Sequence, residues 1–211
     1  MMIQIRHKKT GDVLRELEGD SLSGQFLEGA KLAGADLSNR DLSNVDLQRA
    51  DLRDADLTDA NLRGALLAGA VIRGAAFDGA NLERSDLTDA FANGAGFHGA
   101  NLNGATLRYA KLSEADFSDA TLTGADLSMA ELACDFSRAN LMKADLRGSI
   151  LTGSVLDGAT LLGANLTDAK LTGADLDGAR LEGAIMGGGR RLGPAMFKKK
   201  EIVRPWWQFW G

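Results

Sequence analysis

The stretch DLRDADLTDANLRGA, residues 51–65, repeats one five-residue phrase three times. An apolar residue at every fifth position fits neither the helical spacing of three and four nor the alternation of a strand. From Leu22 the central residue recurs every five positions to Leu132, a four-residue step reaches Phe136, and the period then continues to Leu181. There are 33 such centres, and only Ala92 among them is not Leu, Ile or Phe. So long an internal repeat predicts a solenoid.

Each five-residue unit has the pattern of a short strand followed by a turn. The residue two before the centre is usually Ala, as Ala55 is before Leu57. Two residues apart on extended backbone means the same side, so both point inward and the residue between them points outward. The residue two after the centre is often Gly, Asn or Asp, which tolerate the backbone angles of tight turns. Each unit is therefore one side of a polygonal coil.

The number of sides follows from the aromatic centres. Phe occupies the centre only at Phe77, Phe97, Phe117 and Phe136, with separations of 20, 20 and 19 residues. Four units per coil would stack all four rings in one ladder inside the coil, whereas three units would scatter them. We therefore predict an all-β, four-sided solenoid of about eight coils, ~38 Å long at the ~4.8 Å spacing of paired strands.

The phrase A(D/N)LXX occurs in this chain as ADLRD, ADLTD, ANLRG, ANLNG and ADLSM. It resembles the signature of the pentapeptide-repeat proteins, and the resemblance covers residues 20–186. It implies a right-handed quadrilateral β-helix, the hand being implied by the resemblance alone. Most members of that family resemble binding scaffolds without known chemistry.

The two ends depart from the repeat and divide the chain into 1–19, 20–186 and 187–211. Residues 2–17 have the pattern of a β-hairpin with Gly11 in its turn, which we expect to cover the first coil. Asp20 and Arg40 stand, 20 residues apart, at the position two before the centre that is usually Ala. We expect an ion pair between them that closes the N-terminal end of the coil, and a ligand site there is the alternative.

The tail 187–211 carries a net charge of +5, against −10 for residues 1–186. Its last residues include Trp206, Trp207, Phe209 and Trp210, whose apolar area we expect something to cover. The alternatives are a cap on the last coil, a dimer or partner contact, and a membrane-surface anchor, the last disfavoured because the segment is short. The acidic body argues against direct nucleic-acid binding.

The surface offers one candidate contact. Leu66, Val71 and Phe91 occupy outward slots where Asp or Asn is usual, and the same is true of Ile150 and Val155. Val71 and Phe91 are neighbours in adjacent coils. They form a partner or dimer contact, or else Phe91 turns inward into the space left by Ala92.

Residues with catalytic potential do not cluster. The single cysteine, Cys134, fills a slot that Ala normally occupies and is expected to be buried. His7 and His98 are too far apart to cooperate in the predicted coil. The outward slot before the centre is Asp in eleven units and Asn in five, which indicates turn support as well as an acidic stripe, and the spacing is not that of a calcium loop. We expect no catalysis, no cofactor and no metal.

Two functions remain after these exclusions. The first is a non-catalytic scaffold that binds a protein partner through its flat faces, with homodimerisation as one option. The second is implied by the family branch that mimics DNA and binds DNA gyrase or topoisomerase IV. Duplex DNA carries one charge per about 1.7 Å, whereas −10 over the predicted rod is about one per ~4 Å, which favours the scaffold. No signal peptide or apolar span is evident, so we expect a cytoplasmic protein.

Overall fold

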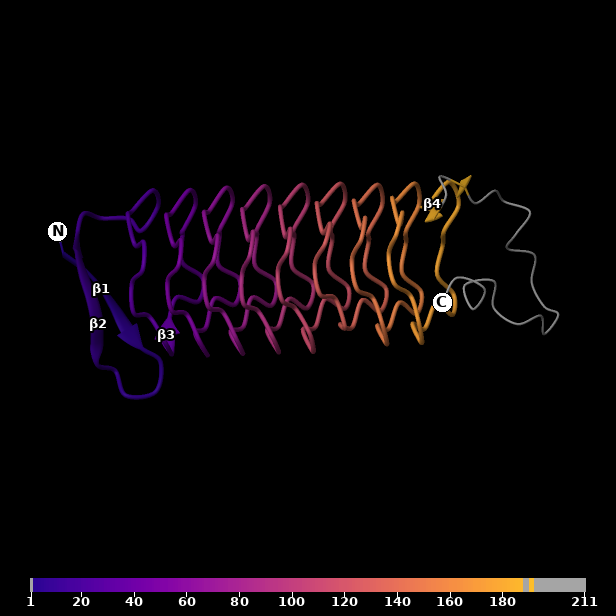
Figure 1. The fold of residues 1–211 in the computed structure, drawn as a ribbon. Helices are drawn as coiled ribbons and strands as arrows, with labels where there is room; N and C mark the ends of the chain where they lie inside the picture. The colour runs from indigo at the N-terminus through magenta and orange to yellow at the C-terminus, as the bar shows by residue number, and fades with distance from the viewer. Residues whose placement is uncertain (1, 188–189, 192–211) are drawn as a thin grey trace.

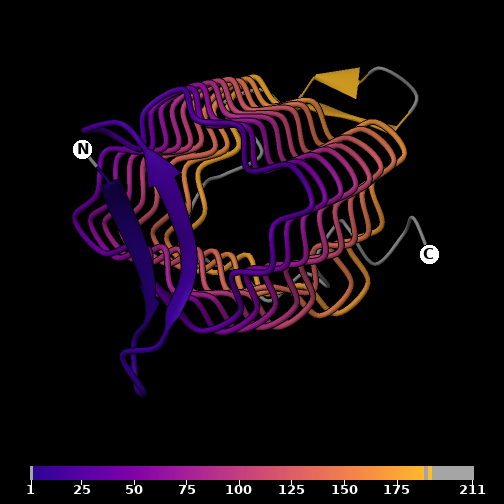
Figure 2. The same cartoon turned by 90° about the vertical axis from the view of Figure 1, so that its left-hand side faces the viewer.

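The computed structural model describes residues 2–187 and 190–191, and they form a rod of stacked coils with a hairpin at its N-terminal end (Figure 1). The regular strands are few and short: β1 Met2–His7, β2 Val13–Glu18, β3 Ala35–Asp36, β4 Ile185–Met186 and β5 Arg190–Arg191. The rest of the ladder consists of isolated parallel bridges between coils, such as Asp51 to Val71. Viewed along its axis, the rod is a stack of four-sided loops (Figure 2).

Each coil is hydrogen-bonded to the next at a fixed offset. Leu52 N–H donates to the carbonyl of Val71 (2.8 Å), and Val71 N–H donates to the carbonyl of Ala50 (2.9 Å). Bridged residues are 20 apart before the four-residue step and 19 apart across it, as between Asp116 and Asp135. The predicted architecture, a quadrilateral β-helix with four units per coil, is therefore confirmed.

Every side ends in a tight turn that closes on the central residue. Ala55 N–H donates to the carbonyl of Leu52 (3.0 Å), and Asp54 between them has φ 54°. A positive φ at the third position of a four-residue turn is the mark of a type II turn, for which Gly is the easiest residue. This requirement explains why Gly, Asn and Asp recur two residues after the centre.

The interior is filled by the inward Ala and the central apolar residue of each unit. Nearly all of them are buried, and the four Phe rings form one column at its middle. Ring centroids are 5.0 Å apart for Phe77 and Phe97, 4.6 Å for Phe97 and Phe117, and 5.1 Å for Phe117 and Phe136. The ladder runs through four consecutive coils and fills the space between their walls.

We number the four sides by the units that stack in them. Side 1 holds the units centred on Leu42 and Leu62, side 2 those on Leu47 and Leu67, and side 3 that on Leu52. Side 4 holds the units of the Phe ladder. Its members are the units 35–39, 55–59, 75–79, 95–99, 115–119, 134–138, 154–158 and 174–178.

The four-residue step is accommodated at a single corner. Cys134 N–H donates to the carbonyl of Leu132 (2.7 Å), so this turn closes one residue earlier than the others. Cys134 is buried in the inward slot, and its thiol lies 2.8 Å from the carbonyl oxygen of Leu112. The inward position of Cys134 is confirmed, and the coil continues without a break.

The N-terminal hairpin has the predicted strands and joins the first coil edge to edge. β1 pairs antiparallel with β2 and, on its other edge, with β3, while Gly11 in the turn has φ 74°. Ile5 of β1 is buried in the same core as the coils. The hairpin thus continues the core at this end of the rod.

The ion pair expected between Asp20 and Arg40 is not among the ion pairs of residues 2–187, and both side chains are exposed. Asp20 lies in a bend before the first stacked centre, so it is not a coil residue beneath Arg40. Gln25 links hairpin and coil instead, because its Nε2 donates to the carbonyls of Glu18 and Ser21 (both 3.2 Å). The described part of the chain has no apolar helix of membrane-spanning length.

Candidate functional site

The outward slot before each centre has a common structural task. At all eleven Asp and all five Asn in this slot, the side-chain Oδ1 accepts a hydrogen bond from the backbone N–H two residues later. Thr58 N–H donates to Asp56 at 3.0 Å, and Arg63 N–H donates to Asn61 at 3.3 Å. The other fourteen are the same in kind. The turn therefore accepts Asp and Asn alike.

On side 1 the choice of Asn has a second cause. Asn61 Nδ2 donates to Asp41 (2.9 Å), Asn81 to Asn61 (3.4 Å) and Asn101 to Asn81 (3.2 Å), which forms a ladder of amides along the rod. An amide both donates and accepts, and the hydroxyl of Thr121 extends the ladder by donating to Asn101 (3.3 Å), whereas an ionised Asp accepts only and could not continue it at neutral pH.

Side 4 has Asp instead of Asn in the same slot, and neither the turn hydrogen bond nor a side-chain ladder requires Asp there. Where side 4 has Asp or Asn in the outward slot before the centre, the residue is always Asp, at Asp36, Asp56, Asp116, Asp135 and Asp175. The positions after the centre add Asp59, Asp78, Asp119, Asp157 and Asp177. Arg138 is the only Lys or Arg among its units, so its ten carboxylates leave a net charge of −9. Sides 1, 2 and 3 carry +2, −4 and +1 by the same count, with Asp20 outside the coils. Nearly all of the net negative charge of the body thus lies on one side.

Arg138 neutralises one carboxylate of side 4. Its Nε and Nη2 donate to the two oxygens of Asp119, at 2.8 and 2.5 Å. Hydrogen bonding from this guanidinium lowers the pKa of Asp119 below its usual value. Both side chains are largely exposed, so we assign the pair little weight in stability.

Side 4 also holds one arrangement that sequence reasoning missed. His98 Nδ1 lies 2.9 Å from Ser118 Oγ and 3.9 Å from Asp119 Oδ2. In a Ser-His-Asp triad the hydroxyl and the carboxylate address different ring nitrogens. Here both face the same nitrogen, and the imidazole is more than half exposed. The 20-residue spacing of His98 and Ser118 was the available signal, and the contact belongs to the surface of the rod rather than to a nucleophilic centre.

The buried thiol leads to a direct prediction. Burial raises the pKa of Cys134, and its thiol is enclosed by the coil. Because the thiolate is the reactive form, we expect Cys134 to remain unmodified by Ellman's reagent in the folded protein at pH 8 and to react fully after unfolding in guanidinium. Rapid modification of the folded protein would contradict the inward position.

The predicted contact residues are placed as follows. Leu66 and Phe91 are exposed, Val71 is half-buried, and Val71 pairs with Phe91 in the next coil. The alternative in which Phe91 turns inward is wrong: Phe91 is 41% exposed although Ala92 is fully buried. Lys111 stays over the Phe91 ring instead, with Nζ 5.5 Å from its centroid. The tail residues Trp206, Trp207, Phe209 and Trp210 lie outside the described residues.

Two exposed residues beside Phe91 were not anticipated. Tyr109 and Met129 occupy turn slots and are 47% and 53% exposed.

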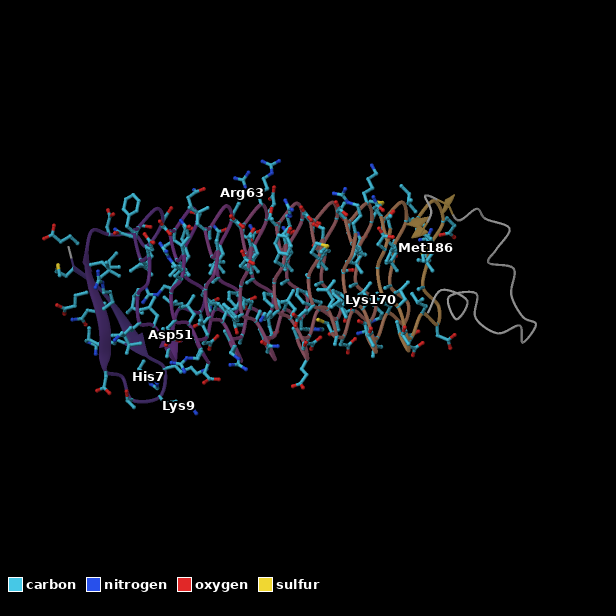
Figure 3. The ribbon with its side chains drawn as sticks, viewed as in Figure 1. His7, Lys9, Asp51, Arg63, Lys170 and Met186 are labelled. Atoms are coloured by element: carbon cyan, nitrogen blue, oxygen red, sulfur yellow. The ribbon has the colours of Figure 1, made fainter. Side chains whose placement is uncertain are left out.

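Within residues 2–187 and 190–191, no group of three or more His, Cys, Asp or Glu is arranged to hold a metal ion. Figure 3 shows the side chains along the rod, with labels on residues such as Asp51, Arg63 and Lys170.

Comparison with known proteins identifies the class. The pentapeptide repeat family model matches this chain in eight copies. The matched residues lie in the ranges 27–59, 50–89, 65–104, 100–133, 133–158 and 149–188. The chain therefore belongs to the pentapeptide repeat family.

Solved structures of the same class include HetL, a pentapeptide repeat protein involved in heterocyst differentiation regulation in the cyanobacterium Nostoc. The match has 34% identity over 80% of this chain and 88% of HetL, with a TM-score of 0.37. The full-length plasmid-mediated fluoroquinolone resistance protein QnrB1 matches at 20% identity over 74% of this chain and 89% of its own, with a TM-score of 0.39. A comparison with curated proteins finds no match.

Proposed function

We propose that this protein is a non-catalytic scaffold that binds a protein partner with a basic surface through side 4. The observation that carries the proposal is the placement of charge: side 4 has ten carboxylates and one guanidinium, and five of the carboxylates lie in outward slots where Asn would serve the turn equally well. Like charges in a row repel one another, so folding gains nothing from this choice. A row of fixed negative charge on a rigid rod steers and orients a basic partner.

The proposal is tested with two matched variants. The first replaces the five outward Asp of side 4 by Asn, at positions 36, 56, 116, 135 and 175. The control replaces five Asp in the same slot of sides 2 and 3, at positions 46, 51, 86, 126 and 145. Each raises the net charge from −5 to 0, since five negative charges are removed, and each keeps the oxygen that accepts the turn hydrogen bond.

We expect proteins captured by the wild type, by crosslinking in extracts of the cells that make it, to be retained by the control variant and lost by the side 4 variant. Capture should weaken as salt is raised, because exposed charges are screened over about 8–10 Å at physiological ionic strength. Equal retention by both variants would show that side 4 is not the binding surface.

A second candidate partner is DNA gyrase or topoisomerase IV, with side 4 as a mimic of DNA. The observation in its favour is that a net charge of −9 lies in a row along one side of the rod, although at about one charge per ~4 Å the row carries less than half the charge density of duplex DNA, which is one per ~1.7 Å. The test is a gyrase supercoiling assay with and without a fluoroquinolone. Inhibition or protection that the side 4 variant loses and the control variant keeps would support this partner, and no effect at micromolar protein would exclude it.

A further inference from the structure

The exposed large apolar side chains of the coils gather along one edge. Between residues 22 and 187 they are Phe26, Leu66, Phe91, Tyr109, Met129, Ile150 and Val155. Six of these seven belong to sides 2 and 3, where Phe26 and Leu66 share the outward slot of side 2, and the half-buried Val71 of side 3 lies with them. We call the set Leu66, Val71, Phe91, Tyr109, Met129 and Ile150 the apolar edge. Such a row on one edge of four is unusual for a surface that faces only water.

The backbone at the centre of this edge is held in an unfavourable conformation. Tyr109 and Met129 have φ of 58° and 61°, in turn slots that Gly occupies in many other coils. A left-handed conformation costs a bulky residue energy that Gly avoids, and other coils hold Arg49, Glu114 and Lys143 in the same turn conformation. In the next coil Gly148 leaves room for Met129, because a Cβ there would collide with its sulfur. The turn thus holds both side chains at the surface of the edge.

Two cations lie beside the aromatic rings of the edge. Arg108 Cζ is 5.4 Å from the centroid of the Tyr109 ring, and Lys111 Nζ is 5.5 Å from that of Phe91. The edge therefore combines aromatic rings, a thioether and cations, all of which make favourable contacts with indole rings.

The described chain ends close to this edge. β5 pairs with β4, and β4 belongs to side 2 of the last coil, so Arg191 leaves the rod from side 2. Trp206 lies fifteen residues beyond Arg191, and this length of chain spans up to about 50 Å when extended. The rod is ~38 Å long, so Trp206 reaches any point of the apolar edge.

The tail and side 2 present their residues in the same order. Going from the end of the rod toward Tyr109, side 2 presents Asp168 and then the ion pair of Asp145 and Arg147 before the apolar residues. The tail presents Lys198–Lys200 and Arg204 first and the aromatic residues 206–210 afterwards. The units of side 2 from the one that holds Tyr109 to the end of the rod have a net charge of −1, and residues 198–204 have a net charge of +3.

We propose that residues 206–210 of the chain's own tail dock on the apolar edge at Phe91, Tyr109 and Met129, with residues 198–204 near Asp168 on the way. Attachment to the same chain gives the segment an effective concentration in the millimolar range, so a weak contact is enough to hold it. This contact does not depend on what side 4 binds.

The test uses the intrinsic fluorescence of the full chain, because all three Trp lie in residues 206–210. The test variant carries Tyr109→Gly and Met129→Gly, which remove the two exposed side chains at positions where Gly suits the backbone. The control carries Arg84→Gly and Lys143→Gly, at φ 57° in turns of side 1. Both pairs relieve backbone strain of the same kind, and urea unfolding establishes that both variants remain folded.

We expect the test variant alone to shift Trp emission to longer wavelength and to raise its quenching by acrylamide, at all protein concentrations. Emission equal to that of the wild type would overturn the proposal and favour the last coil as the site of the tail. An equal shift in both variants would also overturn it, since side 1 is not part of the edge. Wild-type emission that depends on concentration together with a dimer in light scattering would assign the contact to a second copy.

Discussion

Replacing Phe97 by Ala is expected to lower the free energy of unfolding by about 3–5 kcal/mol. Phe97 is fully buried and is stacked on both sides, against Phe77 and Phe117. The walls of the coil are held apart by hydrogen bonds to the coils before and after, so they cannot collapse into the space that the ring leaves. Urea denaturation followed by circular dichroism measures the loss.

Two further variants separate the ladder from the mere presence of Phe. Phe97→Leu restores a centre of the commonest type and should lose less than the Ala variant. Phe91→Ala removes an exposed ring and should change stability by no more than about 0.5 kcal/mol apart from any tail contact. If Phe97→Ala cost no more than Phe91→Ala, the stacked column would not be part of the core.

Replacing Ala100 by Leu is expected to destabilise the protein by about 3 kcal/mol. Ala100 fills the inward slot of side 1 between Ala80 and Ala120, all of them buried. A larger side chain in this column presses on the coils above and below, whose spacing is fixed by backbone hydrogen bonds. Thermal and urea unfolding of the variant measure the effect.

Ser at the same position is the matched control. Ser85 and Ser149 occupy inward slots, and each hydroxyl donates to the carbonyl of the central residue three positions earlier, at 2.8 and 2.7 Å. Ala100→Ser should make the same bond to Phe97 and stay within about 1 kcal/mol of the wild type. Equal losses for Leu and Ser would mean that polarity, and not volume, limits this column.

Much of the fold could be predicted from the sequence because one short rule is repeated. The inward Ala and Leu, the turn residues and the 20-residue spacing of the Phe centres each report local geometry, and together they determine a four-sided coil. Cys134 could be placed as well, since a coil shortened by one residue still needs a small side chain at its inward slot.

The rest depended on neighbours that lie a coil away. Asp20 was taken as a coil residue, but the first coil begins after it, so Arg40 has no partner there. Phe91 stays outward beside Ala92 because Lys111 of the next coil stacks on it. The charge of side 4 becomes visible only when Asp residues are sorted by side, which a total of −10 conceals. The exposure of Tyr109 and Met129 was not predicted, because turn positions with positive φ usually hold Gly, Asn or Asp rather than a large apolar residue.

The central claim is that side 4 carries Asp for binding and not for folding. The most direct measurement is the free energy of unfolding of the variant with Asn at positions 36, 56, 116, 135 and 175, compared with the wild type and with the matched control on sides 2 and 3. We expect the side 4 variant to be as stable as the wild type or more stable, because the turns keep their acceptors and the repulsion is removed. The control also loses the ion pairs of Asp51, Asp126 and Asp145 with Arg53, Arg108 and Arg147. A loss of stability of the side 4 variant relative to the wild type would show that the carboxylates serve the fold, and it would contradict the account.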